Sequence, residues 1–343
     1  MPRAAAAAGR DGDHRSKAVS FTGPLFIVGM PRSGTKLLRG LLNRHPRIGV
    51  PRNETEFLPW LAHRFARFGD LRDRARFDAF YAQMLRHSYF RFQREQGRLV
   101  DAGRWHAACA EFSAAGVFEA LMRTEVDAPR GSERIWGDKS PSYIDDLPLL
   151  KQLYPAARVL HIIRDVRDYC LSMHKAWGKD MLRAAQRWAD GVRKARMDGG
   201  ALGADYLELR YEDLLARTEP ELRRVCAFLG VEFEPQMLVL ERATENLGDA
   251  RGASRVLADN RGKFHHAMTP KTLARVEGLA GPVLLECGYE LTLPLRPARR
   301  LSGLELRLAQ LRDGVRLVRA DRNGWGFWRT ALFHLRYFAT TRG

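Results

Sequence analysis

The 343-residue chain contains no run of 18 or more apolar residues, which is the length that a helix needs to cross a bilayer. Its N-terminus, MPRAAAAAGRDGDHRSK, is small, polar and charged, and it lacks the apolar core of a signal peptide. The sequence therefore predicts a soluble, cytoplasmic protein whose residues 1–20 form a disordered tail.

Cysteine is scarce, and its spacing matches no metal site. The four cysteines lie far apart and form neither a CxxC motif nor a Cys/His pair at ligand spacing. The histidines likewise lack acidic or cysteine partners at such a spacing. We therefore expect a reducing compartment and no bound metal.

Positive charge, by contrast, is abundant. The formal net charge of +17 indicates a polyanionic partner: nucleic acid, an acidic membrane surface or a phosphorylated small ligand. A solvated, arginine-rich surface explains much of this charge equally well. With 45% hydrophobic residues, no fixed repeat and no Pro/Gly/Ser-rich linker near its middle, the chain is expected to fold as one main domain.

Short apolar runs alternate with helical patterns along the chain, which predicts an α/β fold. The expected strands cover residues 24–29, 47–50, 134–137, 158–163 and 205–209, and the expected helices include 141–154, 165–177 and 219–229. This rhythm favours a parallel sheet of about five strands with helices on both faces. Such a sheet binds its ligand at the carboxyl ends of the strands.

Two further helical regions are expected around this sheet. Residues 60–130 are rich in arginine and aromatic residues, and they predict a helical insertion within a domain of residues 21–295. Residues 296–343 predict a basic, amphipathic helical extension that includes Trp325 and Trp328. Such a helix either lies on a membrane or packs against the core or a second subunit, and we favour packing.

A glycine-bounded loop, Gly29-Met-Pro-Arg-Ser-Gly-Thr-Lys36, lies between the first expected strand and a helical pattern. It has the GxxxxG skeleton of a phosphate-binding loop, in which free backbone N–H groups and the helix dipole hold a phosphate. The order Gly34-Thr35-Lys36 departs from the Gly-Lys-Ser/Thr of nucleotide hydrolases. The candidate ligand-binding residues of this loop are Arg32, Ser33, Gly34, Thr35, Lys36 and Leu37.

Residues Pro31 to Leu37 resemble the 5′-phosphosulfate loop of the sulfotransferase superfamily, and the motifs are most similar to its tyrosylprotein and bacterial branch. The resemblance implies a P-loop α/β fold, 3′-phosphoadenosine 5′-phosphosulfate (PAPS) as donor and adenosine 3′,5′-bisphosphate (PAP) as product. It also implies that Arg164, Asp165 and Ser172 form the 3′-phosphate motif, in which a Ser follows a strand-terminal Arg by eight residues.

The resemblance assigns roles to other residues as well. Glu54 matches the glutamate that acts as catalytic base in related tyrosylprotein and glycosaminoglycan enzymes, with Glu56 as the second candidate. Lys139 matches a lysine that supports the leaving phosphate, and Arg32 is expected to neutralise the same group. The residues expected to close around the nucleotide and its 3′-phosphate are Tyr211, Arg261, Gly262 and Lys263.

These motifs predict a sulfotransferase that moves a sulfuryl group from PAPS to a hydroxyl or amine by in-line displacement, without a metal. The rival enzyme is a P-loop kinase or NTPase, which should show Gly-Lys-Ser/Thr and a strand that ends in a magnesium-binding Asp. A nucleic-acid-binding protein is suggested by the charge alone. Saccharide, lipid, peptide and small-molecule acceptors all remain open.

Overall fold

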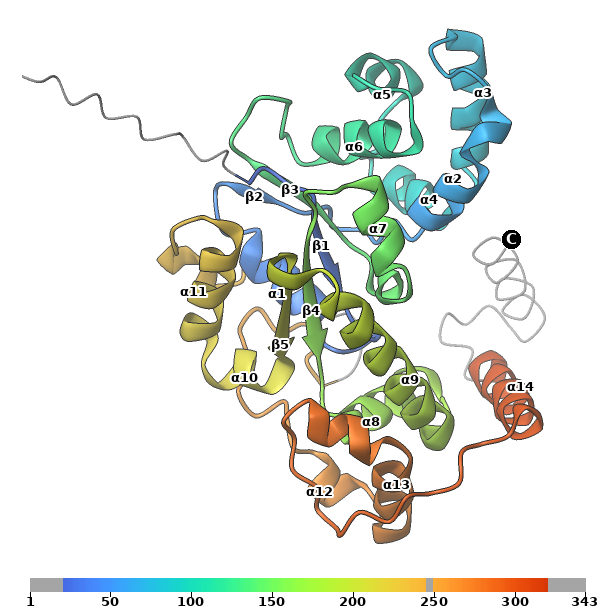
Figure 1. Ribbon diagram of the computed structural model, residues 1–343, viewed down its shortest axis with the longest axis vertical. Helices are drawn as coiled ribbons and strands as arrows, with labels where there is room; N and C mark the ends of the chain where they lie inside the picture. Colours follow the sequence, from blue (N-terminus) through green and yellow to red (C-terminus); the bar gives the residue numbers. More distant parts are fainter. Residues whose placement is uncertain (1–20, 245–248, 320–343) are drawn as a thin grey trace, which may run out of the picture.

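Five parallel strands form one sheet in the computed structural model, which describes residues 21–244 and 249–319 (Figure 1). The strands are β1 (Leu25–Val28), β2 (Ile48–Gly49), β3 (Ile135–Lys139), β4 (Arg158–Ile163) and β5 (Tyr206–Arg210). Their order in the sheet is β2-β3-β1-β4-β5, with every pairing parallel. The expected α/β sheet of about five strands is thus confirmed, and β1 lies at its centre.

The strand β1 shows why the sheet is buried on both faces. Its four residues, LFIV, are fully apolar and fully buried. Because successive side chains point to opposite faces, Leu25 and Ile27 join one apolar cluster while Phe26 and Val28 join the other. A continuous apolar run is typical of a parallel strand that is covered by helices on both sides.

Helices supply those two covering layers (Figure 1). The cluster that contains Leu25 is closed by α1 (Thr35–Leu42), α10 (Tyr211–Ala216) and α11 (Thr218–Leu229). The cluster that contains Phe26 is closed by α7 (Leu147–Leu153), α8 (Val166–Trp177), α9 (Met181–Gly200) and α13 (Pro270–Glu286). Both faces of the sheet are therefore apolar and covered by helices.

Residues 60–130 are helical, as expected, and contain no strand. They form α2 (Leu58–Arg64), α3 (Arg74–Met84), α4 (Ser88–Glu95), α5 (Ala102–Ala108) and α6 (Ala114–Glu125). An aromatic group fixes these helices: Trp105 stacks on Phe90 at 5.6 Å and meets Phe77 edge to face at 5.5 Å. The indole N–H of Trp105 also donates to the carbonyl of Val117, so its buried polar atom is satisfied.

Two expected elements differ in their limits. The third strand, expected to end at residue 137, runs on to Lys139; the side chain of Asp138 is buried there and accepts a hydrogen bond from Thr55. The expected helix 141–154 divides into a 3₁₀ turn (Pro141–Asp145) and α7. Pro148 lacks a backbone N–H and is tolerated only in the first helical turn, so a helix restarts at Leu147.

The C-terminal extension contains the helix α14 (Gly303–Arg319), which Asp313 joins to α9. Asp313 is fully buried there; it accepts a hydrogen bond from the backbone N–H of Asp180 at 2.8 Å and pairs with Arg183 at 2.7 Å. The expected tails, residues 1–20 and the part of the extension with Trp325 and Trp328, lie outside the described residues.

We expect Asp313→Asn to lower the free energy of unfolding by about 1–3 kcal/mol, because it leaves Arg183 without its buried countercharge. The matched control is Asp190→Asn, which breaks the exposed pair between Asp190 and Arg300 and should cost no more than about 0.5 kcal/mol. Urea unfolding measures both. Equal, negligible effects would contradict the packing of α14 on α9.

Candidate active site

The loop between β1 and α1 has the shape of an anion cradle. Gly34, the residue that precedes α1, has a φ of 96°, and no side chain caps the N–H groups at this end of the helix. A Cβ at Gly34 would lie 2.4 Å from the ring of Tyr211, so only glycine fits here. Free N–H groups at the positive end of a helix dipole favour an anion.

Arg164 links this loop to the end of β4. Its guanidinium donates to the carbonyl of Arg32 at 3.1 Å and stacks on the ring of Tyr211 at 4.7 Å. The carboxylate of Asp165 pairs with Arg167 rather than with Arg164. The Nε atom of Arg164 is buried and has no hydrogen-bond partner among the described residues. The structure thus presents a cationic side chain with unused donor capacity.

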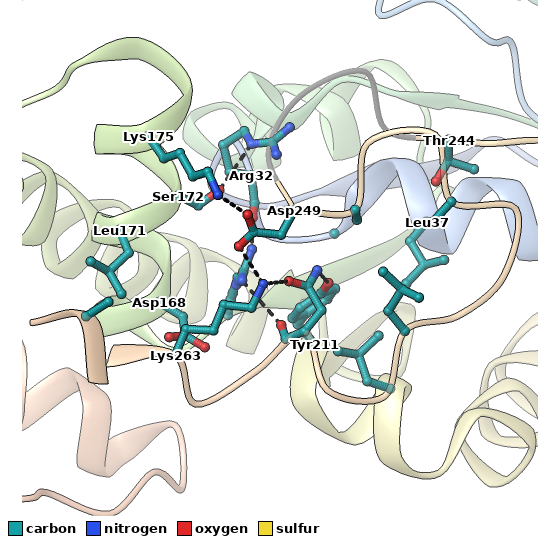
Figure 2. A pocket seen from close by; sticks show the side chains of 18 of the residues that line it. Arg32, Leu37, Asp168, Leu171, Ser172, Lys175, Tyr211, Thr244, Asp249 and Lys263 are labelled. Carbon is teal, nitrogen blue, oxygen red and sulfur yellow. Dashed lines mark hydrogen bonds and ion pairs between the residues drawn. The ribbon is translucent and has the colours of Figure 1, made fainter. Parts of the chain in front are cut away.

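A first cavity, of about 450 Å³, opens beside these residues (Figure 2). Its wall includes Arg32, Gly34 and Leu37 from the loop and α1, and Arg164, Ser172 and Tyr211 from beyond β4 and β5. The hydroxyl of Ser172, on α8, accepts a hydrogen bond from Arg32 at 3.3 Å. The sheet therefore brings together motifs that lie more than a hundred residues apart in the sequence.

The segment after α11 closes the far side of the first cavity. In Figure 2 the carboxylate of Asp249 lies between the ammonium groups of Lys175 and Lys263. Lys263 also donates to the side chain of Asn260 at 2.7 Å, and Asn260 in turn donates to the hydroxyl of Tyr211 at 2.7 Å. These two lysines and one carboxylate make the cavity wall predominantly cationic.

The expected Arg261-Gly262-Lys263 element reaches the cavity only in part. Lys263 lines it, but the side chain of Arg261 is exposed and is not part of the wall. Gly262 has a φ of 67°, which turns the backbone so that the N–H of Phe264 donates to Asp168 at 3.0 Å. Asp168 thereby anchors this turn to α8.

A second cavity, of about 340 Å³, contains Glu54 and Lys139. Their side chains form an ion pair; that of Lys139 is fully buried, whereas that of Glu54 is 30% exposed. Burial disfavours ionisation of Glu54, but the charge of Lys139, with smaller help from Lys36 and Arg39, outweighs it and lowers the pKa of Glu54. Burial in turn lowers the pKa of Lys139.

The helix α1 contributes to the walls of both cavities. Gly34 and Leu37 line the first, whereas Lys36 and Gly40 line the second. Both walls also share Leu240 and Thr244. The two cavities are therefore adjacent, on either side of the start of α1.

A buried hydrogen-bond network holds the segment that carries Glu54. The hydroxyl of Thr55 donates to Asp138 at 3.0 Å and lies 2.6 Å from the hydroxyl of Tyr143. The backbone N–H groups of Thr55 and Glu56 both donate to the hydroxyl of Ser140. This network fixes the segment to the end of β3, which also carries Lys139.

Glu56 is held in a strained conformation beside Glu54. Its φ of 54° lies in the left-handed region, which is unfavourable for a residue with a long side chain. Glu56 also lines the second cavity. Burial, followed by the charge of Glu54, raises the pKa of Glu56 to about 7. The two candidate bases therefore differ in protonation, with Glu54 the more acidic.

The structure gathers most of the residues that the motifs indicated, but in two groups. Arg32, Gly34, Leu37, Arg164, Ser172, Tyr211 and Lys263 line the first cavity, whereas Lys36, Glu54 and Lys139 line the second. Ser33 and Thr35 are buried in the loop itself. Sequence reasoning missed Asp249 and Lys175, because neither belongs to a motif and they meet only across the cavity.

Two further features of the described residues concern metal binding and membrane insertion. Among residues 21–244 and 249–319, no group of three or more His, Cys, Asp or Glu is arranged to hold a metal ion. No helix in the same ranges is long and apolar enough to cross a membrane.

Comparison with known proteins gives a consistent result. The model of the Sulfotransferase family matches residues 24–235, which is more than half of the chain. A protein described as a putative protein-tyrosine sulfotransferase from Caenorhabditis briggsae is 23% identical over 228 residues, covering 64% of this chain and 69% of the relative. The nodulation protein NoeE of Sinorhizobium fredii is 27% identical over 310 residues, covering 78% of this chain and 66% of that protein.

The fold also matches a solved structure. A sulfotransferase domain from the curacin biosynthetic pathway superposes with a TM-score of 0.55 at 20% identity, covering 79% of this chain and 99% of that domain. The likeness extends over nearly the whole of that domain, so the shared architecture is the full sheet with its helical layers.

We expect Glu56→Gln to stabilise the protein at pH 8 but hardly at pH 5. The pKa of Glu56 is 4.5 in its ordinary state and about 7 in the fold. Ionising Glu56 therefore costs the folded state nothing below pH 4.5. Above pH 7 the full cost applies and lowers the free energy of unfolding by about 1–3 kcal/mol. Calorimetric melting at the two pH values measures the difference.

The matched control for this comparison is Glu95→Gln, at an exposed position of α4. Its effect on the melting temperature should be small at both pH values. A gain for Glu56→Gln of the same size at pH 5 and pH 8 would contradict the account, since it would have nothing to do with ionisation.

Proposed function

This chain belongs to the sulfotransferase family, and we propose that its first cavity binds PAPS while its second cavity binds the acceptor. The protein is a PAPS-dependent sulfotransferase. The observation that carries the division of roles is that α1 and the pair Leu240 and Thr244 line both cavities. A sulfuryl group held at the start of α1 would therefore face the ion pair of Glu54 and Lys139.

The donor site is assigned from the anion-binding groups of the first cavity. The backbone N–H groups after Gly34 hold the 5′-phosphate at the start of α1. Arg164 and Ser172 hold the 3′-phosphate, with Lys263 beside them and the ring of Tyr211 as an apolar wall. Two unsatisfied buried atoms support this fit: the Nε atom of Arg164 and the hydroxyl of Ser33 both lack partners among the described residues.

The acceptor reacts beside Glu54. PAPS supplies the sulfuryl group, whose sulfur exchanges its bond to the bridging oxygen of the 5′-phosphate for a bond to the acceptor oxygen. Glu54, ionised because of Lys139, takes the proton from the acceptor hydroxyl or amine. Lys139, Lys36 and Arg32 stabilise the negative charge that develops on the departing phosphate.

The ion pair of Lys139 with Glu54 holds both side chains of the second cavity in place before the reaction. A buried lysine without a countercharge is costly, and Glu54 supplies that charge. When the phosphate of the donor approaches, it offers Lys139 a second anionic partner. Glu54 is then available to the acceptor, so donor binding prepares the base.

The kinase or NTPase alternative is not favoured. Such an enzyme needs an acidic side chain at a strand end that can hold magnesium. Asp165, which follows β4, instead forms a bidentate pair with Arg167, at 2.6 and 2.9 Å, and caps α8. Arg167 also pairs with Glu277 at 2.7 Å, so Asp165 belongs to a buried structural network.

Several further features belong to this proposal. We infer that the enzyme acts in the cytoplasm, in keeping with four free cysteines, and that it needs no metal, because the cations named above supply the positive charge. The helical insertion, residues 60–130, forms part of the acceptor cavity through Ser88, Phe92 and Gln96. In the extension, Asp313 joins the described helix α14 to α9, and we propose that the extension also meets a second subunit or a membrane surface.

PAP should raise the melting temperature of the protein by several degrees at saturation, and AMP or ATP–magnesium should raise it much less. A ligand that binds only the folded state at a hundred times its Kd stabilises it by about 2.7 kcal/mol. Ser172→Ala should weaken the shift, and Arg164→Ala should abolish it. A larger shift with ATP–magnesium than with PAP would contradict the proposal.

Glu54→Gln should lower the transfer of label from radiolabelled PAPS to an acceptor panel by about 10²- to 10⁴-fold, because the amide cannot accept the proton. The variant should retain its thermal shift with PAP. The matched control is Glu241→Gln, another carboxylate of the same cavity, which should stay within a few-fold of the native rate. If Glu56→Gln abolishes transfer and Glu54→Gln does not, Glu54 is not the base.

A further inference from the structure

The rim of the second cavity carries a cluster of arginines. Arg52 and Arg242 line it, and Arg98 lies close by; among the described residues none of the three forms an ion pair. Exposed arginines on surface helices behave differently, since Arg74 and Arg223 each pair with a carboxylate one turn away. The charges of Arg52 and Arg242 are therefore not neutralised by an ion pair within residues 21–244 and 249–319, whereas the charge of Arg98 also acts on Glu125.

These like charges are held close together. Burial, and then the charges of Arg242 and Arg98, lowers the pKa of Arg52. Mutual repulsion of this kind lowers the stability of the free protein, and a bound anion would relieve it. A cleft with an excess of one sign of charge also concentrates ions of the opposite sign. Three flexible arginines on an open surface would move apart.

Backbone and side-chain hydrogen bonds at the rim keep Arg52 and Arg98 close together. The carbonyl of Arg52 accepts a hydrogen bond from the buried guanidinium of Arg39. The next residue, Asn53, donates from its side chain to Gln93 at 2.7 Å, and the carbonyl of Gln93 accepts the N–H of Arg98 at 2.8 Å. Arg52 and Arg98 thus come from segments that are joined to each other, and the cluster is a built feature.

Basic residues outnumber acidic ones in the lining of the second cavity. Its basic residues are Lys36, Arg39, Arg52, Lys139 and Arg242, and its acidic residues are Glu54, Glu56 and Glu241. Glu54 is already neutralised by Lys139, and Glu56 is partly protonated near neutral pH because its pKa is about 7. An anion can therefore enter this cavity beside the base, and Phe92, 40% exposed on the same wall, offers an apolar surface for a ring.

We propose that the acceptor is itself an anion: a hydroxylated molecule whose carboxylate is bound by Arg52 and Arg242 while its hydroxyl reaches Glu54. This inference rests on the proposed function, because it treats the second cavity as the acceptor site. Guanidinium groups match a carboxylate in a two-point geometry, which fixes the orientation of the molecule as well as its charge. A volume of about 340 Å³ suits a single ring with a short acidic side chain.

The test compares three phenols that differ in charge: 3-(4-hydroxyphenyl)propionate, its neutral counterpart tyrosol and its cationic counterpart tyramine. Ligand-detected NMR measures their dissociation constants on the full chain saturated with PAP, so that the first cavity is filled. We expect the propionate to bind about tenfold more tightly than tyrosol, with tyramine the weakest. In the double variant Arg52→Gln/Arg242→Gln the three should differ by no more than about twofold.

The control is Arg275→Gln, which removes the same charge from the exposed face of α13, at the opposite end of the molecule from α4 (Figure 1). It should leave the preference for the propionate intact. Equal binding of the three phenols, binding of none, or a preference that survives in the double variant would overturn the proposal. A thermal shift with PAP in every variant would show that the donor assignment stands independently of that result.

Discussion

The guanidinium of Arg164 is the contact on which the candidate site depends. It extends from the end of β4, donates to the carbonyl of Arg32 in the loop after β1, stacks on Tyr211 at the start of α10 and lies 3.5 Å from the carbonyl of Asn260. One side chain thus fixes three segments that are far apart in the sequence. It can do so because β4 lies between β1 and β5 in the parallel sheet, which places the ends of these strands at one edge.

The second cavity depends on a different kind of constraint, a polar network buried beneath the segment that carries Glu54. Thr55, Asp138, Ser140 and Tyr143 join the turn after β2 to the end of β3. These hydrogen bonds hold the turn against the strand, although one carboxylate oxygen of Asp138 is buried without a hydrogen-bond partner among the described residues. The strained backbone of Glu56 is tolerated because Ser140 holds its N–H group. The proposed base, Glu54, therefore lies on a segment whose position is fixed by its neighbours before an acceptor enters.

The parallel sheet and the loop between β1 and α1 could be predicted from the sequence, because both depend on residues that are close together in the chain. The glycines of the loop indicated a strand-to-helix turn, and the resemblance to sulfotransferases linked Arg164 with Ser172, which line the same cavity. Other parts depend on contacts between distant segments. Asp249 meets Lys175 and Lys263 only across the cavity. The charge of Arg52 belongs to a cluster only because the fold brings Arg242 beside it. No local pattern predicts such pairs, and a short motif such as Arg261-Gly262-Lys263 does not determine which of its side chains line a cavity: Lys263 does, whereas Arg261 is exposed.

The most direct test of the account is a crystal structure of the protein with PAP. The account predicts the 3′-phosphate within hydrogen-bond distance of Arg164 and Ser172, and the 5′-phosphate over the N–H groups at the start of α1, facing Lys139. A bisphosphate bound in the reverse orientation, or outside the cavity lined by Arg32 and Tyr211, would contradict it.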